Sequence, residues 1–224
     1  MRISAFLCTL SFMFGASTLA VAEQHPNLWS DKDPELQAGL EKVLKNIGLL
    51  DEARRGELGL SVVDITDLDH PRMAALNGNR MYYAASLPKI AILLGAFVEI
   101  ERGGMKLDAT TRESLTRMIR VSSNKDATRM LREVGKENLA NILQSDRFRL
   151  YDRKHNGGLW VGKEYSKSGA WKRDPLHNLS HGATPAQAAR FYYMLERGQL
   201  VSKKLSREMK EMLGNPGIHH KFVK

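Results

Sequence analysis

The stretch Ala85-Ser86-Leu87-Pro88-Lys89, followed by the apolar run of residues 90–98, decides the fold of this chain. Serine favours the start of a helix, and a proline in the first turn loses no hydrogen bond, because its missing N–H would have no partner there. The run that follows is apolar on every side, which is typical of a central buried helix. We therefore expect Ser86 to lie at the N-terminus of a buried helix.

Ser86 and Lys89 are three residues apart, so on a helix both side chains rise from one face. A serine hydroxyl becomes a good nucleophile when a neighbouring base takes its proton, and a lysine is such a base only when it is neutral. Burial and the positive end of the helix both favour the neutral amine. The backbone N–H of Ser86 points out of the same helix end and would donate to an oxyanion. The spacing predicts a nucleophile beside its base.

A second Ser-x-x-Lys spacing, from Ser122 to Lys125, shows that this pattern also arises by chance. The setting favours the first copy, because two strand-like segments lead into it and a fully apolar helix follows it. We therefore place the nucleophile at Ser86 and its base at Lys89.

Residues 1–22 have the pattern of a signal peptide. Arg2 supplies the positive start, residues 3–19 are mostly apolar, and Ala20-Val21-Ala22 is a small-residue cleavage site. The apolar run is too short for a stable membrane span. We expect a periplasmic or secreted protein whose single catalytic domain is residues 23–224, with a retained N-terminal anchor helix as the alternative.

The composition excludes several kinds of chemistry. The one cysteine, Cys8, lies inside the predicted signal peptide, so disulfides and thiol catalysis are not expected. The formal net charge is +9, but the lysines and arginines are mixed with acidic residues along the chain. No block of basic residues is interleaved with aromatic residues, so we expect no nucleic-acid partner. The seven histidines lack ligand spacing and no glycine-rich phosphate loop is present, so we expect neither a metal nor a cofactor.

The rest of the chain reads as helices with an early pair of strands. Helices are expected at 34–47, 108–121, 126–134, 184–197 and 202–213, and strands at 58–65 and 73–83, the second broken by a turn at 77–79. The polar run Ser122-Ser123-Asn124 interrupts two helical segments, a place where side chains can point into a cleft. Residues 147–182 have no clear periodicity, and such a stretch in a compact domain is usually functional or mobile.

Ser86-Leu87-Pro88-Lys89 opening a buried helix, with Ser122-Ser123-Asn124 between two later helices, resembles the Ser-x-x-Lys and Ser-x-Asn motifs of serine β-lactamases and penicillin-binding proteins. The order of elements is closest to the class A β-lactamases. The resemblance implies an α/β (α+β) fold of the β-lactamase/transpeptidase type, with a helical subdomain and an antiparallel sheet flanked by helices.

The same resemblance implies roles for four residues. Ser86 would be acylated, and Lys89 would be its base or a proton relay. Ser122 would pass the proton to the leaving nitrogen, and Asn124 would hold the amide side chain of the substrate. The implied substrate is a β-lactam or a cell-wall peptide, and we expect a monomer.

Three departures from the class A pattern stand out. The middle residue of the second motif is Ser123 in place of the common aspartate, and the Glu-x-x-Leu-Asn loop, whose glutamate activates the deacylating water, is absent. Glu164 and Asp174 lie in the corresponding stretch and are the candidates for a deacylating carboxylate, although we expect both to be solvated loop charges. Without a water-activating carboxylate, an acyl-enzyme would form and persist.

The third departure concerns the Lys-Ser/Thr-Gly motif, which this family carries on a late strand. Lys167-Ser168-Gly169 matches this motif in sequence but precedes two predicted helices. We therefore interpret it as a chance match in a loop. The family motif is then expected beyond Lys224, the C-terminal strands are expected to be missing, and the exposed sheet edge predicts poor solubility or low activity.

Three functional hypotheses remain open. The first is an exported serine hydrolase of the class A β-lactamase type, which opens β-lactams by acylation of Ser86 and hydrolysis of the acyl-enzyme. The second is a penicillin-binding-type D-alanyl-D-alanine peptidase, and the third is a catalytically inert relative. Formation and lifetime of a penicillin adduct on Ser86 separate them.

Overall fold

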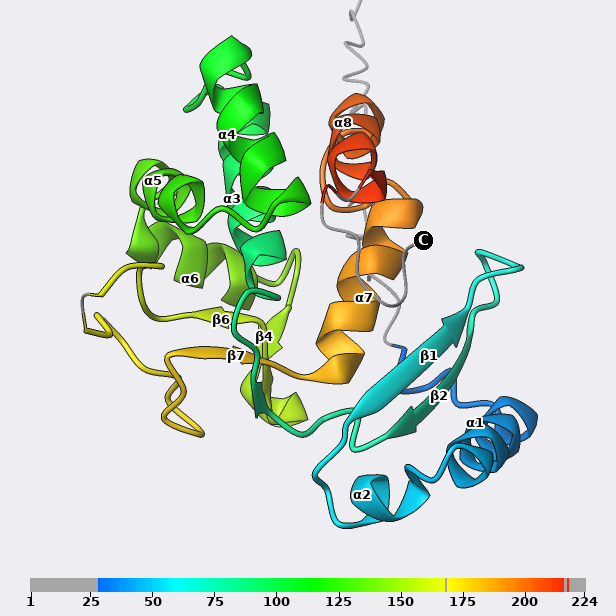
Figure 1. Cartoon of the computed structure of the whole chain (residues 1–224). Coiled ribbons are helices and arrows are strands. Elements are labelled where there is room, and N and C mark those ends of the chain that lie inside the picture. Colours follow the sequence, from blue (N-terminus) through cyan, green and yellow to red (C-terminus); the bar gives the residue numbers. More distant parts are fainter. Residues whose placement is uncertain (1–27, 168, 216, 218–224) are drawn as a thin grey trace, which may run out of the picture.

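The computed structural model describes residues 28–167, 169–215 and 217 (Figure 1). The predicted signal peptide, with Cys8, lies outside the described residues. Within the described part of the chain, no helix is both long enough and apolar enough to cross a membrane.

The described residues form helices and short antiparallel sheets, as the sequence predicts. The helices are α1 (Pro34–Asn46), α2 (Leu50–Arg54), α3 (Lys89–Arg102), α4 (Ala109–Arg120), α5 (Asn124–Val134), α6 (Lys136–Gln144), α7 (Pro185–Glu196) and α8 (Lys203–Gly214), with a short 3-10 helix at Arg153–His155. The strands are β1 (Leu60–Asp64), β2 (Arg72–Leu76), β3 (Tyr82–Tyr83), β4 (Tyr151–Asp152), β5 (Gly157–Gly158), β6 (Trp160–Val161) and β7 (His181–Ala183). The pairings are β1-β2, β3-β7-β6 and β4-β5, all antiparallel.

Helix α3 is the centre of the molecule, because its side chains from Lys89 to Val98 are all buried. Helices α4, α5, α6 and α8 pack against it (Figure 1). Burial of each large aliphatic side chain stabilises the fold by about 1.5–3 kcal/mol. Gly95 permits the close approach of α5 and α6, since a Cβ there would lie 2.9 Å from side-chain carbons of Val134 and Leu139. The helix that follows Ser86 is therefore held in a closely packed core.

The regular turns of α3 begin at Lys89, three residues later than Ser86. The chain before it turns through i to i+3 hydrogen bonds, from Leu87 N to Ala84 O (2.8 Å) and from Lys89 N to Ser86 O (3.1 Å). Ser86 therefore lies on a tight turn that runs directly into the buried helix, and Gly103 ends α3 in the left-handed conformation at φ 80°.

The early strands divide between two sheets. β1 and β2 form a hairpin in which Leu60 is opposite Leu76 and Asp64 is opposite Arg72, and α1 packs against it (Figure 1). The predicted turn is present, with Arg80 N donating to Asn77 O at 2.9 Å. The residues after this turn do not return to β1, because β3 pairs with β7 from the far end of the sequence. Among the described residues, β1 pairs only with β2, which leaves its other edge open.

The stretch without periodicity is ordered by short strands. β6 and β7 are adjacent, and the chain between them, residues 162–180, is called the β6–β7 loop below. Gly162 closes this loop by donating to Ser180 O at 2.8 Å and accepting from Trp171 N at 3.0 Å. Helix α6, which the sequence interpretation did not identify, packs against β6.

Candidate active site

Lys89 is the central residue of the candidate site. It is 2% exposed, and its amine donates to three acceptors: the Ser122 carbonyl at 2.5 Å, the Ser122 hydroxyl at 2.9 Å and the Asn124 side-chain oxygen at 2.8 Å. Ser122 and Asn124 belong to the junction of α4 and α5, which packs beside the start of α3. The fold therefore brings three of the four predicted site residues into direct contact.

Ser122 holds an unusual backbone conformation. Its φ is 54°, in the left-handed region that a non-glycine residue occupies at a cost of about 1–3 kcal/mol. Both of its oxygens accept from Lys89, and these bonds offset the cost. The next residue, Ser123, caps α5 and donates its hydroxyl to Asp126 at 2.5 Å. A carboxylate therefore lies beside the second motif, supplied by Asp126 in the first turn of α5.

Ser86 is exposed on the turn before α3, and its neighbour Ala85 has a φ of 43°. Among the hydrogen bonds of the described residues, none joins the Ser86 hydroxyl to Lys89, whose amine is directed to Ser122 and Asn124. Catalytic hydrogen bonds are often long in the absence of substrate. Ser86 is three residues before Lys89 on this exposed turn, which leads directly into α3.

Burial controls the charges around Lys89. Desolvation lowers the pKa of Lys89 to about 8, which makes the neutral amine accessible near physiological pH. The ring of Tyr165, from the β6–β7 loop, lies 4.8 Å from the amine and stacks on His181 at 4.4 Å. Burial, with the charges of Lys163 and Lys89, lowers the pKa of His181 to about 4, so this imidazole is neutral.

Comparison with known proteins identifies the fold. Residues 39–112 match the sequence model of the β-lactamase enzyme family. A variant of the reconstructed class A β-lactamase of the last common ancestor of Gram-negative bacteria superposes with a TM-score of 0.59 at 17% identity, over 75% of this chain and 68% of that one. The chain has the fold of the serine β-lactamases.

Other structures with this β-lactamase fold match in the same way. A β-lactamase from Sphaerobacter thermophilus superposes with a TM-score of 0.56 at 16% identity, over 78% of this chain and 71% of that one. The structure of PBP-A gives 0.56 at 12% identity, over 84% and 71%. The chain spans 64% to 71% of the lengths of the five solved structures compared. No curated protein sequence matches it significantly.

The two loop carboxylates are not solvated, and our expectation for them is wrong. Glu164 pairs with Arg132 at 2.6 Å and with Lys136 at 2.8 Å, and these contacts lower its pKa to about 2. Asp174 is 2% exposed and accepts hydrogen bonds from the Tyr151 hydroxyl and the His177 amide. Both side chains anchor the β6–β7 loop of this β-lactamase fold, because buried carboxylates need such partners. Neither is hydrogen-bonded to Ser86 or Lys89.

Lys167 and Gly169 lie in the β6–β7 loop, between the bridged residues Lys163 and Ala170, and Ser168 lies outside the described residues. This position in a loop agrees with our interpretation that Lys167-Ser168-Gly169 is not the strand motif of the family. Within the described ranges, no group of three or more histidine, cysteine or acidic side chains is placed to hold a metal ion.

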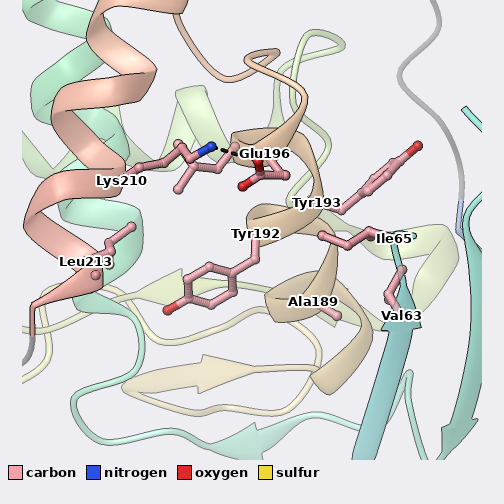
Figure 2. Close-up of a pocket in the computed structure, with 10 residues that line it drawn as sticks. Val63, Ile65, Ala189, Tyr192, Tyr193, Glu196, Lys210 and Leu213 are labelled. Atoms are coloured by element: carbon pink, nitrogen blue, oxygen red, sulfur yellow. Dashed lines mark hydrogen bonds and ion pairs between the residues drawn. The ribbon is translucent and has the colours of Figure 1, made fainter. Parts of the chain in front are cut away.

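A separate hollow of about 450 Å³ lies between β1, α7 and α8 (Figure 2). Apolar side chains such as Val63, Ile65 and Leu213 line it, and the ion pair of Lys210 with Glu196, at 2.7 Å, closes one side. It lies along β1, and none of the predicted site residues lines it.

Proposed function

We propose that this protein is an exported, monomeric serine hydrolase of the class A β-lactamase type, acylated by β-lactams on Ser86. The observation that carries the proposal is the hydrogen bonding of the buried Lys89 amine to Ser122 and Asn124, with Ser86 three residues before Lys89 on the turn into α3. An amine whose pKa is lowered to about 8 is suited to accept the proton of an attacking hydroxyl.

The arrangement supports a complete acylation step. Ser86 Oγ attacks the lactam carbonyl while the neutral Lys89 amine takes its proton, and the backbone N–H of Ser86 donates to the oxyanion. The amide bond then breaks, the Ser122 hydroxyl gives its proton to the leaving nitrogen, and Lys89 restores that proton across the 2.9 Å hydrogen bond. In this proposal, Asn124 holds the side-chain amide of the substrate, the role that the family resemblance implies.

The second candidate is the penicillin-binding-type D-alanyl-D-alanine peptidase. It is favoured by the engagement of Glu164 with Arg132 and Lys136 and of Asp174 with Tyr151, away from the nucleophile. With no carboxylate hydrogen-bonded to Ser86 or Lys89 in the described part of the chain, a water molecule has no evident base for deacylation. Such an acyl-enzyme persists.

The test is intact-protein mass spectrometry after incubation with benzylpenicillin. Wild-type protein should gain one penicillin, which peptide mapping places on Ser86, and Ser86→Ala should gain none. Ser145→Ala is the matched control, since its hydroxyl bonds only the Ile142 carbonyl at the end of α6, and it should label fully.

The lifetime of the adduct then separates the candidates. Release of opened penicillin within seconds supports the β-lactamase, whereas a label that lasts many minutes supports the peptidase. Absence of any adduct on a folded wild-type protein would overturn both and leave the catalytically inert relative.

A further inference from the structure

Tyr165 contacts the candidate site in three ways, although it comes from the distant β6–β7 loop. Its ring lies 4.8 Å from the Lys89 amine, its hydroxyl donates to the Ala85 carbonyl at 3.2 Å, and it stacks on His181 with an interplanar angle of 11°. Burial raises the pKa of the Tyr165 phenol, which therefore remains protonated and a donor. The sequence motifs assign no role to this residue.

The contact with Ala85 bears on the oxyanion donor. The Ala85 carbonyl and the Ser86 N–H belong to one planar peptide unit, so fixing the carbonyl also fixes the direction of the N–H. Ala85 has a φ of 43°, a conformation that alanine adopts only when its surroundings hold it there. The Tyr165 hydroxyl is one such constraint, and it acts directly on the peptide that precedes the nucleophile.

The position of Tyr165 is itself secured from both sides. The adjacent Glu164 is bound to Arg132 of α5 and Lys136 of α6. On the other side the ring stacks on the buried His181 of β7. Tyr165 is thus a fixed cover over the amine.

We infer that Tyr165 is a positioning residue of the acylation site, which shields the Lys89 amine from water and orients the Ser86 peptide N–H. The inference rests on the proposed function.

The other polar and charged groups near the Lys89 amine do not take over the shielding role of Tyr165. Ser122 and Asn124 contact the amine from the α4–α5 junction, and His181 is neutral. Lys163 at the base of the loop adds positive charge near His181. The carboxylates of the neighbouring elements are engaged elsewhere: Glu164 with Arg132 and Lys136, and Asp126 with Ser123 and Arg117.

Two variants separate the two roles. Tyr165→Phe keeps the ring and removes the hydroxyl, so acylation by a fluorescent penicillin should slow about 3- to 10-fold at every pH, while the titration of Lys89 stays unchanged. Tyr165→Ala also admits water to the amine, so the pKa of Lys89 should rise by about one unit and the pH profile of acylation should move upward with it. Tyr192→Ala, at a half-exposed tyrosine of α7, is the control and should change neither measurement.

The pKa of Lys89 is measured without reference to activity, by NMR titration of protein labelled with ¹³C at the lysine ε-carbons, with Lys89→Arg assigning the signal. If Tyr165→Ala does not fold, Tyr165→Gln, which replaces the ring with a hydrated amide, takes its place. An unchanged or lowered Lys89 pKa in a folded variant without the ring would overturn the inference. A wild-type protein that forms no adduct, but whose Lys89 titration responds as stated, would overturn the proposed function and leave the shielding of Lys89 in place.

Discussion

The Lys89 amine lies 2.9 Å from the Ser122 hydroxyl, although the two residues are 33 positions apart in the sequence. With the Ser122 carbonyl and Asn124, the amine has three acceptors, which match the three protons of an ammonium group. To act as a base it must lose one proton, after which its lone pair can accept a hydrogen bond in place of one that it donated. These contacts suit the protonated amine, and loss of one proton is the step that prepares Lys89 to act as a base.

The first prediction concerns the pH dependence of acylation. With a pKa of about 8 for Lys89, about a tenth of the amine is neutral at pH 7, and the neutral fraction grows as the pH rises through 8. The rate of Ser86 acylation should rise about tenfold per pH unit below pH 8 and level off above it. Stopped-flow measurement with a fluorescent penicillin checks this, and a rate that does not change between pH 6 and 9 would contradict it.

The second prediction uses the left-handed backbone of Ser122. Ser122→Ala keeps the cost of a φ of 54°, whereas Ser122→Gly removes it. The glycine variant should be more stable than the alanine variant by about 1 kcal/mol in urea unfolding. Both should lose at least a hundredfold in acylation, because both lack the hydroxyl that relays the proton. Equal stability of the two variants would show that the conformation is not strained.

The third prediction concerns the anchor of the β6–β7 loop. The folded state holds the pKa of Glu164 at about 2, below its ordinary 4.5, through Arg132 and Lys136. Its contribution to stability is therefore fully present above about pH 4.5 and is lost as the pH falls through 2. Glu164→Gln should lower the melting temperature at pH 7, and the difference from the wild type should shrink as the pH is lowered.

Glu133→Gln is the matched control for that measurement. Glu133 pairs with Arg129 at 2.7 Å on the more exposed face of α5. A surface pair of this kind contributes about 0.2–1 kcal/mol, so its removal should have the smaller effect. An equal loss in both variants would argue against a special role for Glu164.

The fourth prediction compares two helical glycines. A methyl group at Gly95 of α3 would lie 2.9 Å from carbons of Leu139 and Val134, whereas one at Gly39 of α1 would meet nothing within 4 Å. Alanine is favoured over glycine within a helix by about 1 kcal/mol, but overpacking costs about 1–3 kcal/mol. Gly39→Ala should therefore stabilise the protein and Gly95→Ala should destabilise it, as measured by urea unfolding.

The elements that depend on local pattern could be predicted from the sequence. The apolar run of α3 and the Thr184-Pro185 start of α7 lie where they are expected, because periodicity and capping are local properties. The meeting of Lys89 with Ser122 and Asn124 agrees with the family resemblance. Helix α6 was missed, although its buried side chains Leu139, Ile142 and Leu143 follow a helical spacing that could have identified it.

The contacts of the β6–β7 loop could not be predicted in this way. In the sequence, Glu164 resembles an ordinary charged loop residue, and only the fold of α5 and α6 brings Arg132 and Lys136 beside it. Tyr165 belongs to no recognisable motif. The only local indication of the Glu164 ion pairs was the spacing of Arg132 and Lys136, two basic residues four positions apart. Long-range approach, and not local sequence, decides these contacts.

The division of the site between helices suggests a use for the protein as a reporter. Ser86 and Lys89 precede the exposed connection at Gly103 and Gly104, whereas Ser122 and Asn124 follow it. Two polypeptides separated at this connection would each carry half of the proton path and an incomplete core. Covalent capture of a fluorescent penicillin would then signal that the halves, and any proteins fused to them, have come together.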